Sequence, residues 1–312
     1  MFLIRVLRRR IKIIIACLSV ILALYLGLSV LGAAATMQLP RLPVNGSPAS
    51  VGLTFQDVAF SARVDAITLK GWFLPSSGDS VLIIVHGGFE NRLDPQVGTI
   101  NLAKDLVQKG YNILLFDLRG RGESGGTGLS LSNENRDIGG AVDYLKTRGY
   151  PTGKIGIIGF CSGAANACIF ASQDTDIGGL VLDGCFSKVE DMFYNQASKY
   201  GIPRLAVDIF VPSIKLAAKV FYGYSEINPI DVVGKVQCPI FFIHEGNDDL
   251  VSIADAKALF QASNGQTNIL WEVDDITHVH AFQAYPDEYV KRVSEFFVTT
   301  LHSTIQSGLP AQ

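Results

Sequence analysis

The feature that most constrains this sequence is a short apolar run that ends in a turn of small residues, at positions 154–165 (KIGIIGFCSGAA). Its isoleucines predict a buried β-strand, because β-branched residues favour strands. Gly159 and Gly163 flank Cys161 two residues away on either side, and the alanines that follow favour a helix. A strand, a tight turn between two glycines and a helix form a nucleophile elbow. Cys161 is therefore the predicted nucleophile.

A thiol stands here where the common G-x-S-x-G pattern has a serine. Ser162 does not replace it, because centring the motif on Ser162 would put Phe160 and Ala164 at the glycine positions, and Phe160 would not fit. A thiol is chemically sensible at a helix N-terminus, where the macrodipole favours the thiolate. The alternative is a small buried cysteine in an ordinary turn between strand and helix.

The N-terminus carries a basic cluster followed by an uncharged apolar run over residues 13–35. As a helix this run is about 35 Å long, which is enough to span a bilayer. We expect residues 1–36 to be a retained single-pass signal anchor, with cleavage after Ala33–Ala35 and secretion as the alternative. The positive-inside rule places the N-terminus in the cytoplasm and the main domain across the membrane, in an extracytoplasmic position.

The rest of the chain divides by composition. Residues 37–50 contain three prolines and read as a linker. Residues 51–304 alternate apolar strands with helical segments, which predicts an α/β domain with a doubly wound, mostly parallel sheet. The region at about 187–236 has helical apolar stripes and no strand, so it predicts a small helical lid, with ordinary packing helices as the alternative. Residues 305–312 are expected to be a C-terminal tail.

Composition excludes several classes of function. The net charge of −3 comes with no basic stripe, so no nucleic-acid partner is expected. The five cysteines form no C-x-x-C pair and have no zinc-ligand spacing with histidine. We therefore expect no metal and no cofactor.

A nucleophile needs a base, and the base needs an acid that orients it. Downstream of Cys161, Asp248 and Asp249 follow an apolar strand that ends at His244, and His278 follows the next strand. Both turns come at the carboxyl ends of strands, where α/β sheets place their sites. The order of nucleophile, acid and histidine along the chain is the order found with nucleophile elbows.

Several motifs together carry a family resemblance. They are His86-Gly87-Gly88 with Asn91-Arg92, the D-x-R-G-x-G-x-S segment Asp117–Ser124, the turn His244–Asp248, and His278 with the helix near Pro286. With them the chain resembles the α/β-hydrolase superfamily over residues 55–297, and in particular its membrane-tethered serine-hydrolase-like branch with a small lid. The cysteine elbow is similar to the dienelactone-hydrolase branch. Glu245 departs from the pattern, because glycine is usual at its position.

The resemblance implies roles for particular residues. Cys161 would be the nucleophile, Asp248 the acid and His278 the base. The backbone N–H groups of Ser162 and Gly88 would form the oxyanion hole, with Phe89 as the alternative to Gly88.

Other residues compete for these roles. Asp249 is interpreted as a turn or capping residue, and Asp183 as a turn residue, although some relatives place the acid at the strand end that Asp183 occupies. His280 is expected to line the pocket or to face solvent. Cys168 lies seven residues after Cys161 on the same helix; we interpret it as core, with a redox partner as the alternative.

The expected activity is hydrolysis of a carboxylic ester, thioester or lactone through an acyl-enzyme on Cys161, with a small-molecule, ester-like substrate. An alternative from another class is a non-catalytic, membrane-tethered binding protein that has lost its serine. A third hypothesis makes Cys161 a redox sensor, because a free thiol across the membrane is open to oxidation.

Overall fold

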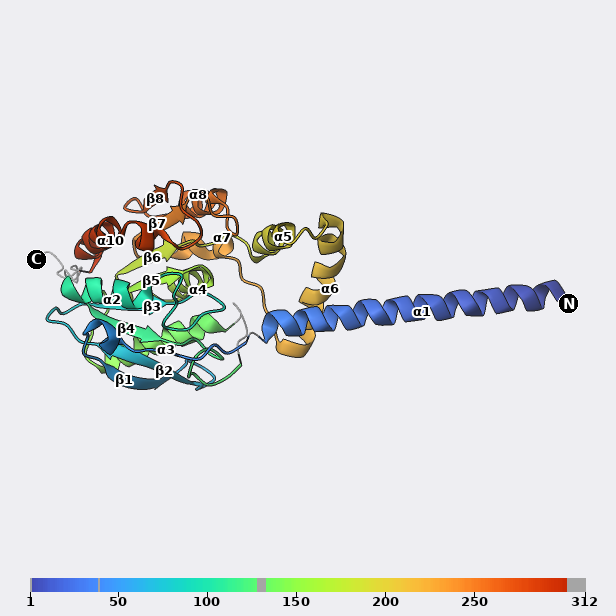
Figure 1. Cartoon of the computed structure of the whole chain (residues 1–312), viewed down its shortest axis with the longest axis horizontal. Coiled ribbons are helices and arrows are strands. Elements are labelled where there is room, and N and C mark those ends of the chain that lie inside the picture. The colour runs from blue at the N-terminus through green and yellow to red at the C-terminus, as the bar shows by residue number, and fades with distance from the viewer. Residues whose placement is uncertain (1, 39, 128–132, 302–312) are drawn as a thin grey trace, which may run out of the picture.

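The computed structural model describes residues 2–38, 40–127 and 133–301. It consists of an α/β body from which one long helix projects (Figure 1). The expected tail at 305–312 and the last residues of the expected domain lie outside the described residues, so that boundary stays a prediction.

A single sheet of eight strands forms the centre of the body, in the order β1-β2-β4-β3-β5-β6-β7-β8. The strands are β1 (Gln56–Ser61), β2 (Thr68–Leu74), β3 (Val81–Val85), β4 (Asn112–Phe116), β5 (Ile155–Phe160), β6 (Gly179–Asp183), β7 (Ile240–Glu245) and β8 (Ile269–Val273). Strand β2 pairs antiparallel with β1 and with β4, and all the other pairs are parallel. The prediction of a mostly parallel sheet is confirmed.

The sheet is covered by helices on both faces, which confirms the doubly wound prediction. Alternate residues of one strand enter different clusters: Val81 packs in the first cluster and Leu82 in the second. Helices α3 (Glu134–Thr147), α4 (Ser162–Ala171) and α8 (Ile253–Ala262) contribute to the first cluster. Helices α2 (Thr99–Gln108) and α10 (Pro286–Thr300), with the short α9 (Ala281–Ala284), contribute to the second. Because both faces are covered, the inner strands β3 to β7 are buried at every position, whereas β1 and β8 at the edges are partly exposed.

The remaining helices belong to the N-terminal segment and to the region of the expected lid. Helix α1 (Phe2–Met37) has 36 residues, and its stretch from Ile4 to Met37 is long and apolar enough to cross a membrane. Helices α5 (Val189–Lys199) and α6 (Arg204–Tyr222) leave the body on the side from which α1 projects (Figure 1). The short α7 (Pro229–Val232) and a 3-10 turn (Val233–Lys235) lead back to the sheet at β7. A second 3-10 turn (Pro48–Val51) precedes β1.

Substitution of Gly140 tests how closely α3 packs on the chain that follows β1. A Cβ at Gly140 would lie 2.3 Å from the backbone oxygen of Ser61. Alanine normally stabilises a helix relative to glycine by about 1 kcal/mol, but this backbone contact reverses the sign. We expect Gly140→Ala to lower the free energy of unfolding by about 1–3 kcal/mol, measured by urea denaturation in detergent.

Gly139 supplies the matched control. A Cβ at Gly139 would meet the side chain of Arg63, at 2.7 Å from its Cδ. This side chain pairs with Asp143 and Asp174, but a side chain can shift at a lower cost than backbone. Gly139→Ala should therefore cost less than Gly140→Ala. Equal losses in the two variants would contradict the packing argument.

Candidate active site

Cys161 lies at the apex of a strained turn between β5 and α4. Its backbone has φ 52° and ψ −118°, a region that residues other than glycine rarely adopt. The Cys161 N–H donates to the Asp183 carbonyl oxygen at 2.9 Å, and the Cys161 carbonyl accepts from the Ala165 N–H at 3.1 Å. Strain of this kind persists only where the surrounding structure fixes it, and it is found at functional sites.

The two flanking glycines are required by close backbone approach. A Cβ at Gly159 would lie 2.6 Å from the Cα of Ala164, and a Cβ at Gly163 would lie 2.4 Å from the His86 carbonyl oxygen. Both contacts are with backbone atoms, which cannot move aside cheaply. Ser162, by contrast, is the first residue of α4 and is buried. The turn therefore presents Cys161 and not Ser162 at its apex.

The structure brings His278 and Asp248 together although 30 residues separate them. His278 Nδ1 donates to Asp248 Oδ2 at 2.5 Å. The other oxygen of Asp248 accepts the N–H groups of Leu250 and Val251, at 2.9 and 2.8 Å, so the carboxylate is held from both sides. The neighbouring Asp249 points outward and pairs with Lys199 at 2.6 Å. Of the two adjacent aspartates, Asp248 is the one that contacts the ring.

The His278 ring also interacts with Cys161. Burial by itself lowers the pKa of His278, but the negative charge of a Cys161 thiolate and the hydrogen bond to Asp248 outweigh it and raise the pKa to about 11. Among the described residues, no group forms a hydrogen bond of ordinary geometry with Nε2. The ring is thus near enough to stabilise a thiolate, while Nε2 stays available to exchange a proton.

The predicted oxyanion donors lie beside one another. Ser162 carries the first N–H of α4, and the first N–H groups of a helix have no partner within it. A Cβ at Gly88 would lie 2.9 Å from Ser162 Oγ, so the loop after β3 touches the start of α4. The buried Arg121 donates through Nε to the Gly88 carbonyl at 2.6 Å, which fixes the peptide of that loop. Phe89, the alternative donor, has a largely exposed side chain.

A pair of buried carboxyl groups lies behind the histidine and acid turns. Asp183 ends β6 and accepts from the Tyr289 hydroxyl at 2.8 Å. Glu245 ends β7, and its Oε1 accepts the Ala281 N–H at 3.3 Å. Its carbonyl also accepts the Asp248 N–H at 3.3 Å, so Glu245 bonds to both turns. Asp183, the rival acid, accepts from Tyr289, whereas the Nδ1 of His278 bonds to Asp248.

Burial sets the charge of this pair. Burial, the charge of Asp183 and the hydrogen bond between the two carboxyl groups together raise the pKa of Glu245 to about 9. Burial also raises the pKa of Asp183, to about 6, against the lowering effect of hydrogen bonds from Glu245 and Tyr289. Near neutral pH one proton therefore stays on Glu245. From the sequence, Glu245 stood out only as a departure from glycine. The pair could have been found from the sequence, because Asp183 and Glu245 each end a predicted strand and these strands are neighbours in the sheet.

Asp94 is a further residue near the elbow that sequence reasoning missed. A Cβ at Gly87 would lie 3.6 Å from the Cβ of Cys161 and 3.9 Å from Asp94 Oδ2. Asp94 Oδ1 accepts the N–H groups of Gln96 and Val97, which orders the loop after β3. Burial raises the pKa of Asp94. The signal was an aspartate before a proline, a pair that favours turns.

The other candidate histidines and cysteines have different surroundings. His244 is buried and bonds through Nε2 to the Val251 carbonyl at 3.0 Å, whereas His280 bonds through Nδ1 to the His278 carbonyl at 2.6 Å. All five cysteines are free. Cys168 is buried, and burial raises its pKa to about 12, which makes it a poor nucleophile and a poor redox partner.

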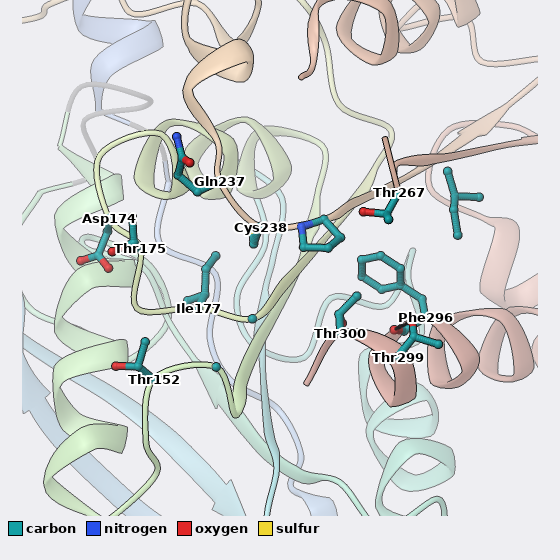
Figure 2. Close-up of a pocket in the computed structure, with 14 residues that line it drawn as sticks. Thr152, Asp174, Thr175, Ile177, Gln237, Cys238, Thr267, Phe296, Thr299 and Thr300 are labelled. Carbon is teal, nitrogen blue, oxygen red and sulfur yellow. Dashed lines mark hydrogen bonds between the residues drawn. The ribbon is translucent and has the colours of Figure 1, made fainter. Parts of the chain in front are cut away.

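A surface pocket lies away from these residues. Figure 2 shows it, with a volume of about 500 Å³ and a lining that includes Thr152, Cys238, Thr267 and Thr300. Three of these residues precede β5, β7 and β8, and Thr300 ends α10, so the pocket lies at the amino ends of the strands, whereas Cys161 lies at the carboxyl end of β5. Over the described residues, no group of three or more His, Cys, Asp or Glu side chains is placed to hold a metal ion.

Comparison with known proteins agrees with this architecture. Residues 80–206 match the family model described as the alpha/beta hydrolase fold. The esterase Pf2001 of Pyrococcus furiosus superposes with a TM-score of 0.74 at 26% identity, over 85% of this chain and 98% of that one. The protein YqkD of Bacillus subtilis is 28% identical over 245 residues, which cover 76% of this chain and 77% of YqkD.

The fold, the family-model match and these neighbours define the class. The chain has the α/β-hydrolase fold, with a sheet and an elbow in the places that the sequence predicted. Its similarity to an esterase of solved structure supports a hydrolase of the esterase type.

Replacement of Glu245 by glutamine should flatten the pH dependence of stability. The folded-state pKa, about 9, lies above the ordinary value of 4.5, so between these values the folded chain holds a proton that the unfolded chain has released. The contribution of Glu245 to the free energy of unfolding is complete below pH 4.5. It falls as the pH rises toward 9, by up to about 1.4 kcal/mol per pH unit. Glutamine stays neutral and removes this slope, as urea unfolding across that pH range measures.

Glu295→Gln, an exposed glutamate on α10, is the matched control and should leave the wild-type slope in place. His278 also makes the free energy of unfolding fall with pH above its ordinary pKa, and this slope persists in both variants. An unchanged slope in Glu245→Gln would show that Glu245 is not held protonated.

Proposed function

We propose that this chain hydrolyses an ester-like bond through Cys161, His278 and Asp248. The observation that carries the proposal is the 2.5 Å hydrogen bond between His278 and Asp248, formed beside the strained turn of Cys161. The likeness to the Pyrococcus furiosus esterase supports the class of reaction. Carboxylic esters, thioesters and lactones are the candidate substrates.

In the first half of the proposed reaction, Cys161 Sγ attacks the carbonyl carbon and forms a tetrahedral intermediate. The negative charge moves to the carbonyl oxygen, where the N–H groups of Ser162 and Gly88 stabilise it. His278, which has taken the thiol proton, delivers it through Nε2 to the leaving oxygen or sulfur. The bond to the leaving group breaks, and an acyl group remains on Cys161 as a thioester.

In the second half, His278 takes a proton from water, and the resulting hydroxide attacks the thioester carbon. The carbon–sulfur bond breaks, and the proton on His278 returns to the sulfur. Asp248 keeps Nδ1 protonated throughout and stabilises the charged ring. Each turnover therefore consumes one water and releases an alcohol or thiol and an acid, with no other co-reactant.

We also propose that α1 is a retained membrane anchor, with its basic N-terminus in the cytoplasm and the body across the membrane. The packing of its last third supports retention: Ser29, Ala33 and Met37 are 1%, 0% and 5% exposed. Cleavage at the alanines would cut a helix that is packed against α6. The linker, residues 37–50, is tied to the body, since Arg41 donates to the Ser124 carbonyl at 2.5 Å.

The non-catalytic binding protein remains the second candidate, and the cysteine at the elbow motivates it. Loss of catalysis would release the chain from the strain at Cys161 and from the buried contact between His278 and Asp248. Both features are present. We therefore favour the enzyme.

Ester hydrolysis by variants tests the proposal. With activated short-chain esters, we expect Cys161→Ala and His278→Ala to lose about 10²–10⁴-fold in rate, because each lacks a group that acts in the transition state. Asp248→Asn should lose activity too, since an amide cannot stabilise the charged ring. Asp249→Asn is the matched control and should keep the wild-type rate. Equal rates in wild type, Cys161→Ala and His278→Ala would end the proposal.

A further inference from the structure

The expected lid carries an apolar stripe that the protein leaves uncovered. Leu205, Ile209, Leu216 and Val220 recur along α6 at intervals of four and seven residues, so they lie on one side of the helix. Their side chains are 69%, 48%, 62% and 66% exposed. A contiguous row of large apolar side chains that are exposed to this extent marks an interaction surface.

The side of α6 that adjoins the stripe is packed against α1, and the contact begins at Ile209 itself. The Tyr25 hydroxyl donates to the Ile209 carbonyl at 2.9 Å, and the hydroxyls of Ser29 and Ser213 lie 2.7 Å apart. Close approach at Gly32 continues the contact, because a Cβ there would lie 2.8 Å from Ile214 Cδ1. Small residues and hydroxyl pairs of this kind are typical of helices that pack within a membrane.

The contact with α1 sets the depth of α6 relative to the bilayer. If the bilayer core begins after Lys12, about 20 residues of helix cross its roughly 30 Å and the span ends near Gly32. The contacts with α6 run from Tyr25 to Met37, at the far end of this span. Helix α6 crosses α1 near the end of α1 that meets the body (Figure 1). It therefore lies at the level of the outer boundary between acyl chains and headgroups.

The charged side chains of α6 other than Lys219 have partners on α5 or on the chain that follows α6. Lys215 pairs with Glu190 and Glu226, at 3.1 and 2.9 Å, and Asp208 accepts from the Tyr194 hydroxyl at 2.5 Å. These contacts join α6 to α5 and to the chain after α6. They leave the side with the stripe apolar except for Lys219, whose long stem can carry its charge to the headgroups.

We propose that α6 is a second membrane element: an interfacial helix whose stripe rests in the outer leaflet beside α1. The occupant of the stripe is a lipid bilayer, because the stripe continues the apolar surface of the anchor, on which Leu24, Leu28 and Leu31 are also exposed. Helices with one apolar side bind at this boundary with that side buried about 5–10 Å deep. The proposal rests on α1 as an anchor.

This position has a consequence for the substrate, which rests on the proposed esterase function. Helix α5 joins the lid to the acid turn: Lys199 pairs with Asp249 at 2.6 Å, and Asn195 donates to the Leu250 carbonyl at 3.1 Å. The lid therefore lies between the leaflet and the turn that carries Asp248. The substrate class that this arrangement favours is an ester with an acyl chain long enough to dissolve in the leaflet.

Tryptophan quenching tests the position of α6 without any activity measurement. Full-length Leu216→Trp, in phosphatidylcholine vesicles with brominated acyl chains, should lose the added tryptophan fluorescence. Val298→Trp is the matched control: Val298 is 51% exposed on α10, at the far end of the body from α1 (Figure 1), and should not be quenched. If Leu216→Trp does not fold, Val220→Trp replaces it. Quenching of the α6 tryptophan no stronger than that of the control overturns the proposal.

Hydrolysis of two esters tests the substrate class. Leu216→Glu combined with Val220→Glu should slow hydrolysis of p-nitrophenyl palmitate dissolved in vesicles by at least about tenfold, while p-nitrophenyl acetate in water is hydrolysed at the wild-type rate. Val298→Glu, at the exposed α10 position used above, controls for added negative charge and should leave both rates unchanged. Equal losses on both esters, or no loss on either, would overturn the substrate class. If the wild type hydrolyses neither ester, the esterase proposal fails, and quenching alone decides the position of α6.

Discussion

The close approach of backbone at the β5–α4 turn is the constraint on which the rest of the site depends. Helix α4 starts so near to β5 and to the chain after β3 that side chains at Gly159 and Gly163 would collide with backbone. This leaves Cys161 a left-handed backbone conformation, which the hydrogen bond from its N–H to Asp183 holds in place. The same closeness brings Gly88 beside Ser162. One packing contact thus places the sulfur and both predicted oxyanion donors.

Buried charge holds the second half of the site together. Asp248 accepts two backbone N–H groups and the His278 ring, so its charge is satisfied without water. Behind it, Glu245 bonds to both the acid turn and the chain after His278. A buried carboxyl group is costly unless it is neutral or fully bonded, and Glu245 meets this condition by keeping its proton. The pair with Asp183 thereby links the carboxyl ends of β6 and β7 beneath the histidine.

Helix α1 and the segment of the expected lid, residues 187–236, pack together in this fold. A transmembrane helix that served only as a tether would need no contacts with the body, yet the last turns of α1 pack on α6 through polar and small residues. The lid is in turn tied to the turn of Asp248 through α5. Helix α1, helices α5 and α6, and the turn of Asp248 are therefore mechanically connected.

The sequence by itself determined the sheet, the elbow and the apolar N-terminal helix. Each of these is encoded locally: β-branched runs make strands, glycines two residues from Cys161 permit the turn, and an uncharged run of helix length makes α1. Only the tertiary structure decided which of two adjacent aspartates faces His278, because a shift of one residue reverses the direction of a side chain in a turn. It also decided the roles of Asp94, Glu245 and Tyr289, and the packing of α6 on α1. Those contacts join residues far apart in the chain, and no local pattern specifies them.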